Sequence, residues 1–238
     1  MAINALMLSA SRVDNTDYLE HALPYIDAMY KSCKGHWLFI PFAGVTMSYD
    51  AYLDKVQAAL KPLNITISGI HQHPDPIKAI EQANGVMVGG GNTFELLNQL
   101  YRQQLIEPLK GRIEAGMGYI GWSAGSNITG LSIRTTNDMP IVEPHSFDAL
   151  AILPFQLNPH YSNYHPPGHN GETRAERLQE FCSLNPETAV VGIQEGSALW
   201  RKDNQLTLVG NKQAFFFKGD VHQQTIAVDC DLSHLLAD

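Results

Sequence analysis

Cysteine is scarce in this sequence, and the few cysteines that occur are far apart. The 238 residues include only Cys33, Cys182 and Cys230, and no Cys-x-x-Cys pair. Three widely separated cysteines suggest neither a disulfide framework nor a zinc ribbon. We therefore expect a reduced protein of the cytoplasm.

Long hydrophobic runs and clusters of basic residues are also missing. No apolar stretch approaches the roughly 20 residues that a membrane-spanning helix needs. The first twenty residues lack the basic segment of a secretory signal and Asn4 breaks their apolar run, so they are better explained as a core strand. The net charge of −8, without any Lys/Arg cluster, argues against a nucleic-acid binder. We expect neither a nucleic-acid nor a membrane partner.

Apolar segments and amphipathic segments alternate through the first half of the chain. Strands are expected at 3–10, 36–43, 64–70, 85–91 and 117–122. Helical spacing occupies 17–32, with Pro24 as a possible kink, then 48–60, 75–83 and 93–103, and a further helix is expected to follow up to Glu114. Such regular alternation predicts a parallel sheet covered by helices on both faces.

The second half has a different character. Residues 140–168 are rich in Pro, His and Asn, which is typical of long ordered loops. A helix is expected at 172–183 and a buried strand at 188–194, followed by antiparallel strands with turn signals at Asp203-Asn204 and Gly210-Asn211. No repeat or linker divides the chain, so we expect a single domain over residues 1–238.

The sequence Gly-Trp-Ser-Ala-Gly, residues 121–125, places Ser123 between a predicted strand and a predicted helix. This pattern is typical of a nucleophile elbow, in which a tight turn projects the serine oxygen above the sheet. The helix beginning at Ala124 would direct free N–H groups at the same point. Two alternatives stay open: Ser123 caps the helix, or Ser126 is the nucleophile.

A second glycine-rich turn follows the strand expected at 85–91. If this turn lies beside Ser123, the N–H groups of Gly91 and Ala124 would form an oxyanion hole. A phosphate-binding loop or a plain turn is the alternative. The lack of Gly-Lys-Ser/Thr excludes a Walker loop, and the consecutive glycines fit a dinucleotide-binding fingerprint poorly.

A serine nucleophile needs a base, and the base needs an orienting group. Among the ten histidines, His160 is the best candidate for the base, because it lies in a loop after an apolar segment. Glu195 follows a predicted buried strand, on the same rim as Ser123, although a solvated turn glutamate is an equal alternative. The order Ser, His, Glu argues against an ordinary α/β-hydrolase esterase, which runs Ser, Asp/Glu, His.

The histidines at 160, 165 and 169 also raise the possibility of a metal site. Their spacing matches no recognised zinc pattern, no His-Glu-x-x-His is present, and Pro166-Pro167 intervenes. We therefore expect no metal and no cofactor, and keep a zinc hydrolase as a distant alternative.

Six ordered motifs resemble the peptidase E family of aspartyl dipeptidases over almost the whole chain. They are GGGNTFELL, GWSAGSN, TTNDMPIV, PFQLNPHY, GHNGETRAERL and GIQEGSAL. The resemblance implies a flavodoxin-like three-layer α/β sandwich with a mostly parallel sheet, as in class I glutamine amidotransferases. Those amidotransferases carry His-x-Glu after a cysteine elbow, and this sequence contains no His-x-Glu.

The resemblance also implies roles for individual residues. Ser123, His160 and Glu195 match the family's catalytic triad, and Gly91 and Ala124 match its oxyanion-hole positions. The implied activity is metal-independent removal of N-terminal aspartate, chiefly from dipeptides.

Arg174 matches the arginine that the family uses for the substrate's acidic side chain. A planar guanidinium suits a buried carboxylate. The alternatives are a surface arginine paired with Glu172 or Glu176, or a binding role for Arg177 instead.

The residues that bind the free amino group are harder to identify. Candidates are Asn137, Asp138 and Glu172. The loop at 163–171 is long and ends in glycine, so it is a candidate lid over the substrate.

Two other functions stay open. A cyanophycinase-like peptidase would share the serine elbow but need an open groove for its polymer. A binding module would keep the fold without turnover. The oligomeric state, monomer or homodimer, is not indicated.

Overall fold

The computed structural model describes residues 3–168 and 170–237 and contains a central seven-stranded sheet in the order β3-β2-β4-β5-β1-β8-β9. Five of these strands are mutually parallel: β1 (Asn4–Leu8), β2 (His36–Ile40), β3 (Thr66–Gly69), β4 (Gly85–Val88) and β5 (Gly118–Trp122). An antiparallel hairpin completes the sheet: β8 (Ser197–Lys202) and β9 (Gln205–Gly210). The Asp203-Asn204 turn joins the two hairpin strands, as expected.

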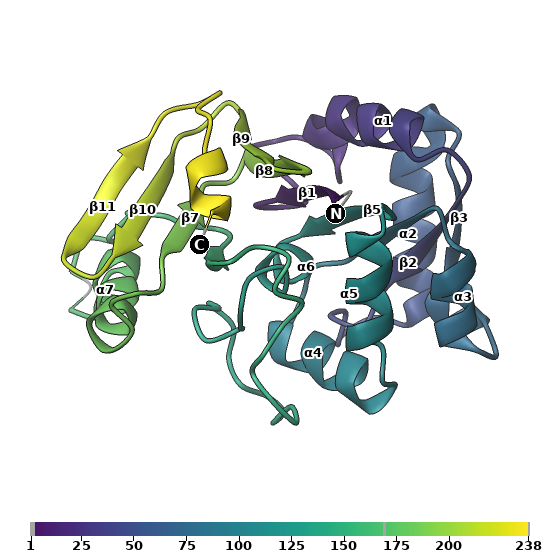
Figure 1. Ribbon diagram of the computed structural model, residues 1–238, viewed down its shortest axis with the longest axis horizontal. Helices are drawn as coiled ribbons and strands as arrows, with labels where there is room; N and C mark the ends of the chain where they lie inside the picture. The colour runs from purple at the N-terminus through teal and green to yellow at the C-terminus, as the bar shows by residue number, and fades with distance from the viewer. Residues whose placement is uncertain (1–2, 169, 238) are drawn as a thin grey trace.

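Helices cover both faces of this sheet (Figure 1). One face packs against α1 (Leu23–Ser32) and α2 (Tyr49–Leu60). The opposite face packs against α3 (Pro76–Gln82), α4 (Thr93–Arg102) and α5 (Ile106–Glu114). The expected three-layer α/β architecture with a mostly parallel sheet is therefore confirmed. Within the described part of the chain, no helix is long and apolar enough to cross a membrane.

Local sequence signals explain where several helices begin. The side chains of Ser48, Asp75 and Asn92 each accept a backbone N–H three residues later, and so cap α2, α3 and α4. Pro24 does not kink a long helix, as the sequence suggested. It lies in the first turn of α1, where its missing N–H has no cost, and a separate 3₁₀ turn (Glu20–Ala22) precedes it. Further 3₁₀ turns occur at Lys61–Leu63, Ile70–Gln72 and Ser233–Leu236.

A second sheet, which the sequence did not predict, lies beside the first. Its strand order is β11-β10-β7-β6, formed by β6 (Gln156–Asn158), β7 (Val190–Ile193), β10 (Ala214–Lys218) and β11 (Val221–Ile226). Strand β6 runs parallel to β7, whereas β10 is antiparallel to both of its neighbours. The turn at Gly210-Asn211 therefore does not close a hairpin, because β9 and β10 belong to different sheets.

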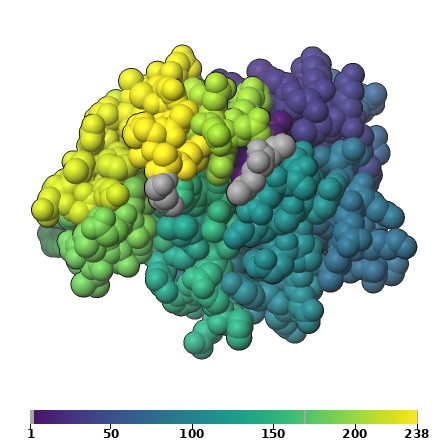
Figure 2. Space-filling model, in the orientation of Figure 1, coloured from purple at the N-terminus to yellow at the C-terminus, as the bar shows by residue number. Residues whose placement is uncertain are grey.

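The second sheet packs between α7 (Arg174–Leu184) on one face and the core of the central sheet on the other. Phe215 and Phe217 pack with Leu178 and Cys182 of α7. On the opposite face, β7 contributes to the same core cluster as the central sheet. In the space-filling view, the strands near the C-terminus and α7 form one end of the molecule, and the first half of the chain forms the other (Figure 2).

Candidate active site

Ser123 lies on a strained turn between β5 and the single helical turn α6 (Ala124–Asn127). Its backbone φ of 54° and ψ of −116° are disfavoured for a residue with a side chain, and such strain costs about 1–3 kcal/mol. A Cβ on Gly121 would lie 2.4 Å from the Gly125 carbonyl oxygen, and one on Gly125 would lie 2.1 Å from that of Val88. Glycine is therefore required on both sides of the turn, as the elbow pattern predicts.

The two alternative explanations of this segment do not match the structure. Ser123 makes no side-chain cap hydrogen bond to α6. Ser126 is fully buried, and its Oγ donates to the Leu8 carbonyl oxygen at 2.6 Å, away from the surface. Because α6 has only four residues, its free N–H groups would contribute more to stabilising an anion near Ser123 than a helix dipole would.

A histidine and a carboxylate are aligned with this serine. His160 Nε2 lies 2.9 Å from Ser123 Oγ, and His160 Nδ1 lies 2.6 Å from Glu195 Oε1. The side chains of His160 and Glu195 are 39% and 54% exposed, so water can reach both. This geometry allows a proton to pass from the serine oxygen to the imidazole while the carboxylate fixes the ring.

The second sheet explains why His160 and Glu195 meet. His160 follows β6 and Glu195 follows β7, and these parallel neighbours end at the same edge. The rim that carries Glu195 therefore belongs to the second sheet and not, as the sequence analysis assumed, to the sheet that carries Ser123. Ser9, just beyond β1, joins the two sheets. Its buried Oγ accepts the His160 N–H and donates to the Ile193 carbonyl oxygen, both at 2.9 Å.

The two predicted oxyanion-hole positions flank this serine. Gly91 has a φ of 138°, and a Cβ there would lie 2.0 Å from the Ala43 carbonyl oxygen, so only glycine fits. A Cβ on Gly90 would lie 2.9 Å from Ser123 Cβ, which shows how closely the glycine turn approaches the elbow. Among the described residues, no acceptor pairs with the Gly91 or Ala124 N–H.

Tyr52 of α2 fixes the glycine turn from behind. Its hydroxyl donates to the Gly90 carbonyl oxygen at 2.9 Å and accepts from Tyr18 Oη at 3.2 Å and Trp122 Nε1 at 3.3 Å. These three bonds use the donor and both acceptor sites of the hydroxyl. Burial raises the pKa of Tyr52, so the hydroxyl stays protonated and remains a donor.

One cavity next to Ser123, which we call the Arg174 cavity, has a volume of about 260 Å³. Its lining includes Ser123, His160, Asp138 and Arg174, the first residue of α7. Burial lowers the pKa of the Arg174 guanidinium, and nearby Arg177 lowers it further. No carboxylate in the described part of the chain lies within 4.0 Å of this cation. Burial costs the guanidinium part of its hydration free energy. An anionic ligand bound beside it would therefore offset this cost.

Asp138 lies in the same cavity, but one of its oxygens is already engaged. Oδ2 accepts the Thr93 N–H at 2.7 Å and the Thr93 hydroxyl at 2.5 Å, at the first residue of α4. The other oxygen, Oδ1, accepts no hydrogen bond among the described residues. Asp138 therefore holds the start of α4 through Oδ2 and keeps Oδ1 available as a hydrogen-bond acceptor.

The other two candidates for the amino group have different surroundings. Asn137 lines the Arg174 cavity, yet its Nδ2 donates to the Pro159 carbonyl oxygen and its Oδ1 accepts from Asn158, both at 2.8 Å. It therefore holds the segment that leads into His160. Glu172 lines neither cavity at Ser123, and its carboxylate lies 3.7 Å from Arg177 Nε. The ion pair that was the alternative role of Arg174 is made by Arg177 instead. A contact between Glu172 and substrate stays a prediction.

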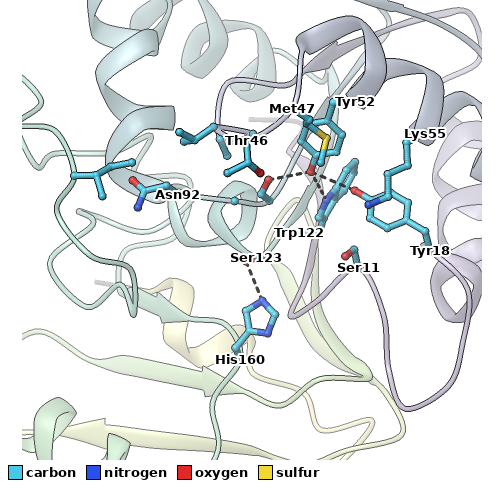
Figure 3. Close-up of a pocket in the computed structure, with 16 residues that line it drawn as sticks. Ser11, Tyr18, Thr46, Met47, Tyr52, Lys55, Asn92, Trp122, Ser123 and His160 are labelled. Atoms are coloured by element: carbon cyan, nitrogen blue, oxygen red, sulfur yellow. Dashed lines mark hydrogen bonds between the residues drawn. The ribbon is translucent and has the colours of Figure 1, made fainter.

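A larger cavity, of about 480 Å³, opens on another side of the same serine (Figure 3). We call it the Lys55 cavity. Ser123 and His160 line both cavities, so the candidate reacting atoms stand at their junction. The Lys55 cavity is further lined by Tyr18, Lys55 and Trp122 and by the apolar side chains of Val45, Met47 and Ile141.

The possible histidine metal site finds no support in the described residues, which contain no cluster of three or more metal-binding side chains. His165 Nε2 lies 3.2 Å from the Gly171 carbonyl oxygen. His169 lies outside the described residues. The rest of the 163–171 loop is irregular, and its proposed motion as a lid stays a prediction.

Comparison with known proteins identifies the family to which this α/β sandwich belongs. The model of peptidase family S51 matches residues 5–209, and the chain belongs to that family. It is 61% identical to peptidase E of Shewanella amazonensis over 236 residues, which is 99% of this chain and 100% of the relative. Peptidase E of Shewanella putrefaciens is 58% identical over the same shares. The protein is thus a peptidase.

A solved structure gives the same fold at much lower sequence similarity. A peptidase from an acI-B1 actinobacterium matches with a TM-score of 0.74, at 15% identity, over 98% of this chain and 97% of the other. The fold is therefore retained where most side chains differ.

Three residues at the site were not predicted from the sequence: Ser9, Tyr52 and Lys55. Ser9 lies near the end of the strand expected at 3–10, and its position close to a strand end was an available signal. Tyr52 and Lys55 lie inside an ordinary amphipathic helix, so only the packing of α2 against the glycine turn identifies them.

Proposed function

We propose that this protein is a serine-type aspartyl dipeptidase that cleaves the bond after an N-terminal aspartate. The observation that supports this most is the pairing of two features at one point. The aligned Ser123, His160 and Glu195 adjoin a cavity whose half-buried arginine has no carboxylate within 4.0 Å among the described residues. A serine that is activated beside an unpaired cation suits an acyl group that carries its own carboxylate.

The proposed reaction begins with a proton transfer. A carboxylate can only accept, so Glu195 selects the imidazole tautomer with its hydrogen on Nδ1, which leaves Nε2 free to accept from Ser123. As Ser123 Oγ attacks the scissile carbonyl carbon, its proton moves to Nε2. Glu195 then stabilises the imidazolium, which returns the proton to the leaving amine. Water repeats these steps on the aspartyl ester and releases aspartate, so no metal or cofactor is needed.

The N–H groups of Gly91 and Ala124 are proposed to stabilise the tetrahedral oxyanion. They lie on either side of Ser123, and neither has an acceptor among the described residues. Their directions are fixed by the glycine turn and by the elbow, so little reorganisation accompanies the reaction. One such donor contributes about 10²- to 10³-fold to kcat.

Recognition of the aspartyl residue is assigned to the Arg174 cavity. Arg174 binds the β-carboxylate, and the free Oδ1 of Asp138 binds the α-ammonium group, so each charge of the N-terminal residue meets an opposite charge. Asn137 positions the segment before His160 and is assigned no substrate contact. We propose that the whole chain, residues 1–238, works as one peptidase domain on small peptides.

The test compares four dipeptides, Asp-Leu, Asn-Leu, Glu-Leu and Leu-Leu, with three proteins: the wild type, Arg174→Met and Arg177→Met. We expect efficient cleavage of Asp-Leu only, and a loss of about 10²-fold or more in its kcat/KM in Arg174→Met, because the substrate carboxylate then enters a partly buried site without its cation. Arg177→Met removes an exposed cation from the same helix and should keep most activity. Equal cleavage of Asp-Leu and Leu-Leu, or an unaffected Arg174→Met, would contradict the proposal. A folded wild type that cleaves nothing would favour a binding module.

A further inference from the structure

The Lys55 cavity is assigned no role by the catalytic scheme above. Ser123 attacks a carbonyl carbon that joins two parts of the substrate. If the aspartyl part occupies the Arg174 cavity, the part that leaves as an amine extends into the other cavity that Ser123 and His160 line. The Lys55 cavity is therefore the place for the leaving segment, and this inference rests on the proposed function.

The walls of this cavity are apolar and aromatic. Val45, Met47 and Ile141 line it while remaining 54%, 38% and 52% exposed, respectively. A ligand that covers these large apolar side chains removes them from water, which makes its binding free energy more favourable. Trp122 and Tyr18 meet edge to face, with ring centroids 6.2 Å apart, and form an aromatic wall. The first residue of the leaving segment therefore finds apolar contacts.

One positive charge lines the same cavity. Lys55 Nζ lies 4.2 Å from the centroid of the Tyr18 ring, and Lys55 and Tyr18 appear together on one side of Ser123 in Figure 3. No carboxylate among the described residues lies within 4.0 Å of Lys55. A ring face attracts a cation but leaves most of its hydrogen-bonding capacity free. The ammonium group can therefore bind an anion.

A second cation increases the local positive charge. Arg12 interacts electrostatically with both Lys55 and Tyr18, and, after burial, it is the cause that lowers the pKa of Lys55. Arg12 is not among the residues that line the cavity, but its charge acts on the Lys55 ammonium that does, although the whole chain carries a net charge of −8. Repulsion between the two cations is unfavourable in the free protein, and a bound anion would reduce it.

We propose that Lys55 recognises the terminal carboxylate of the leaving segment, so that the enzyme prefers peptides whose leaving residue ends in a free carboxylate. Every unblocked peptide has this group, and in a dipeptide it belongs to the residue that departs. Lys55 has four rotatable carbon bonds in its side chain, which allows the ammonium group to follow the carboxylate. With Arg174 and Asp138 on one side and Lys55 on the other, the site selects a short substrate by the charges at both ends.

The experiment compares Asp-Leu with its C-terminal amide, Asp-Leu-NH₂, in the wild type and in Lys55→Met. The two substrates differ only in the terminal charge, and methionine keeps the length of the lysine stem. We expect the wild type to favour the free acid about 3- to 10-fold in kcat/KM, mainly through KM, because the pair is partly exposed. Lys55→Met should bring this ratio to about 1, and Lys55→Arg should restore part of it. Raising the salt concentration should lower the wild-type ratio.

Lys61→Met is the matched control. Lys61 follows α2 directly, is exposed and does not line the cavity, so its loss changes the net charge equally. It should leave the ratio of acid to amide unchanged. Inhibition by free leucine, compared with leucinamide, gives a readout that does not depend on turnover, and Lys55→Met should abolish the difference.

The possible failures are distinguishable. If the wild type cleaves both substrates with equal kcat/KM and Lys55→Met changes neither, the role of Lys55 is wrong while the aspartyl dipeptidase proposal stands. The same conclusion follows if Lys61→Met lowers the ratio as much as Lys55→Met. If the wild type cleaves neither substrate, the proposed function itself fails, and the assignment of this cavity fails with it.

Discussion

The hydroxyl of Tyr52 donates a hydrogen bond of 2.9 Å to the carbonyl oxygen of Gly90. This carbonyl and the N–H of Gly91 belong to the same planar peptide unit, and in a trans peptide they point in opposite directions. By holding the carbonyl on one side, Tyr52 fixes the direction of the N–H that we assign to the oxyanion hole. If Gly91 serves the oxyanion hole as proposed, α2 controls its geometry through this one hydrogen bond.

Tyr52→Phe should therefore lower kcat more than it raises KM. We expect kcat to fall about 3- to 30-fold, less than for removal of an oxyanion donor, because the N–H is still present but less well held. The free energy of unfolding should fall by about 1 kcal/mol, since the Gly90 carbonyl and Trp122 Nε1 lose a partner. Steady-state kinetics and urea unfolding measure the two effects.

Tyr18→Phe is the control for this variant. It removes the hydrogen bond into Tyr52 but leaves the bond from Tyr52 to Gly90. Its kcat should stay within about 2-fold of the wild type. A Tyr52→Phe enzyme with wild-type kcat, or with a change in KM alone, would show that this tyrosine does not position the oxyanion hole.

The elbow gives a second prediction, in which two glycine-to-alanine changes have opposite effects. Gly125→Ala would place a Cβ 2.1 Å from the Val88 carbonyl oxygen, so we expect a loss of about 1–3 kcal/mol in the free energy of unfolding and loss of most activity. Gly111→Ala, inside α5, has no atom within 4 Å of its new Cβ and should stabilise the protein by about 0.5–1 kcal/mol. Thermal unfolding and activity of both variants test this pair, and equal effects would contradict it.

A third prediction concerns stability in mild acid. Burial lowers the pKa of His21, against a smaller opposing effect of Glu195, and neither ring nitrogen has a partner among the described residues. Below about pH 6.5 the unfolded chain therefore binds a proton that the folded protein does not bind. The free energy of unfolding should consequently fall as the pH falls below about 6.5.

His21→Phe should reduce this decline, because phenylalanine does not titrate. Urea unfolding at pH 7.5 and 5.5 measures the difference, with His222→Phe on the exposed part of β11 as the control. If His21→Phe leaves the pH dependence unchanged, His21 is not a source of the acid sensitivity. His36, whose pKa is also lowered by burial, would then be the next candidate.

The sequence predicted the central sheet and the elbow well because both depend on local patterns. Hydrophobic alternation marks the strands, and two glycines around Ser123 mark the tight turn. The second sheet was missed because β6 has only three residues and β11 is largely exposed, so neither carries a clear pattern. Glu195 was placed on the correct kind of strand end but in the wrong sheet.

The charged residues show a different limit. Arg174 and Arg177 lie three residues apart on one helix, and no local rule says which of them reaches the cavity. The choice depends on the packing of α7 against the second sheet, which leaves Arg177 with the exposed Glu172. Tyr52 and Lys55 depend in the same way on contacts with residues far along the chain, which periodicity does not encode.

The most direct test of the central claim is the rate of Asp-Leu hydrolysis by the wild type and by Ser123→Ala, both with a metal chelator present. If Ser123 is the nucleophile, the wild type keeps its activity in chelator and kcat/KM of Ser123→Ala falls by about 10⁴-fold or more. Ser123→Ala that retains its thermal unfolding temperature would show that this loss reflects chemistry and not misfolding. Cleavage of Asp-Leu by Ser123→Ala at a rate near that of the wild type would contradict the account.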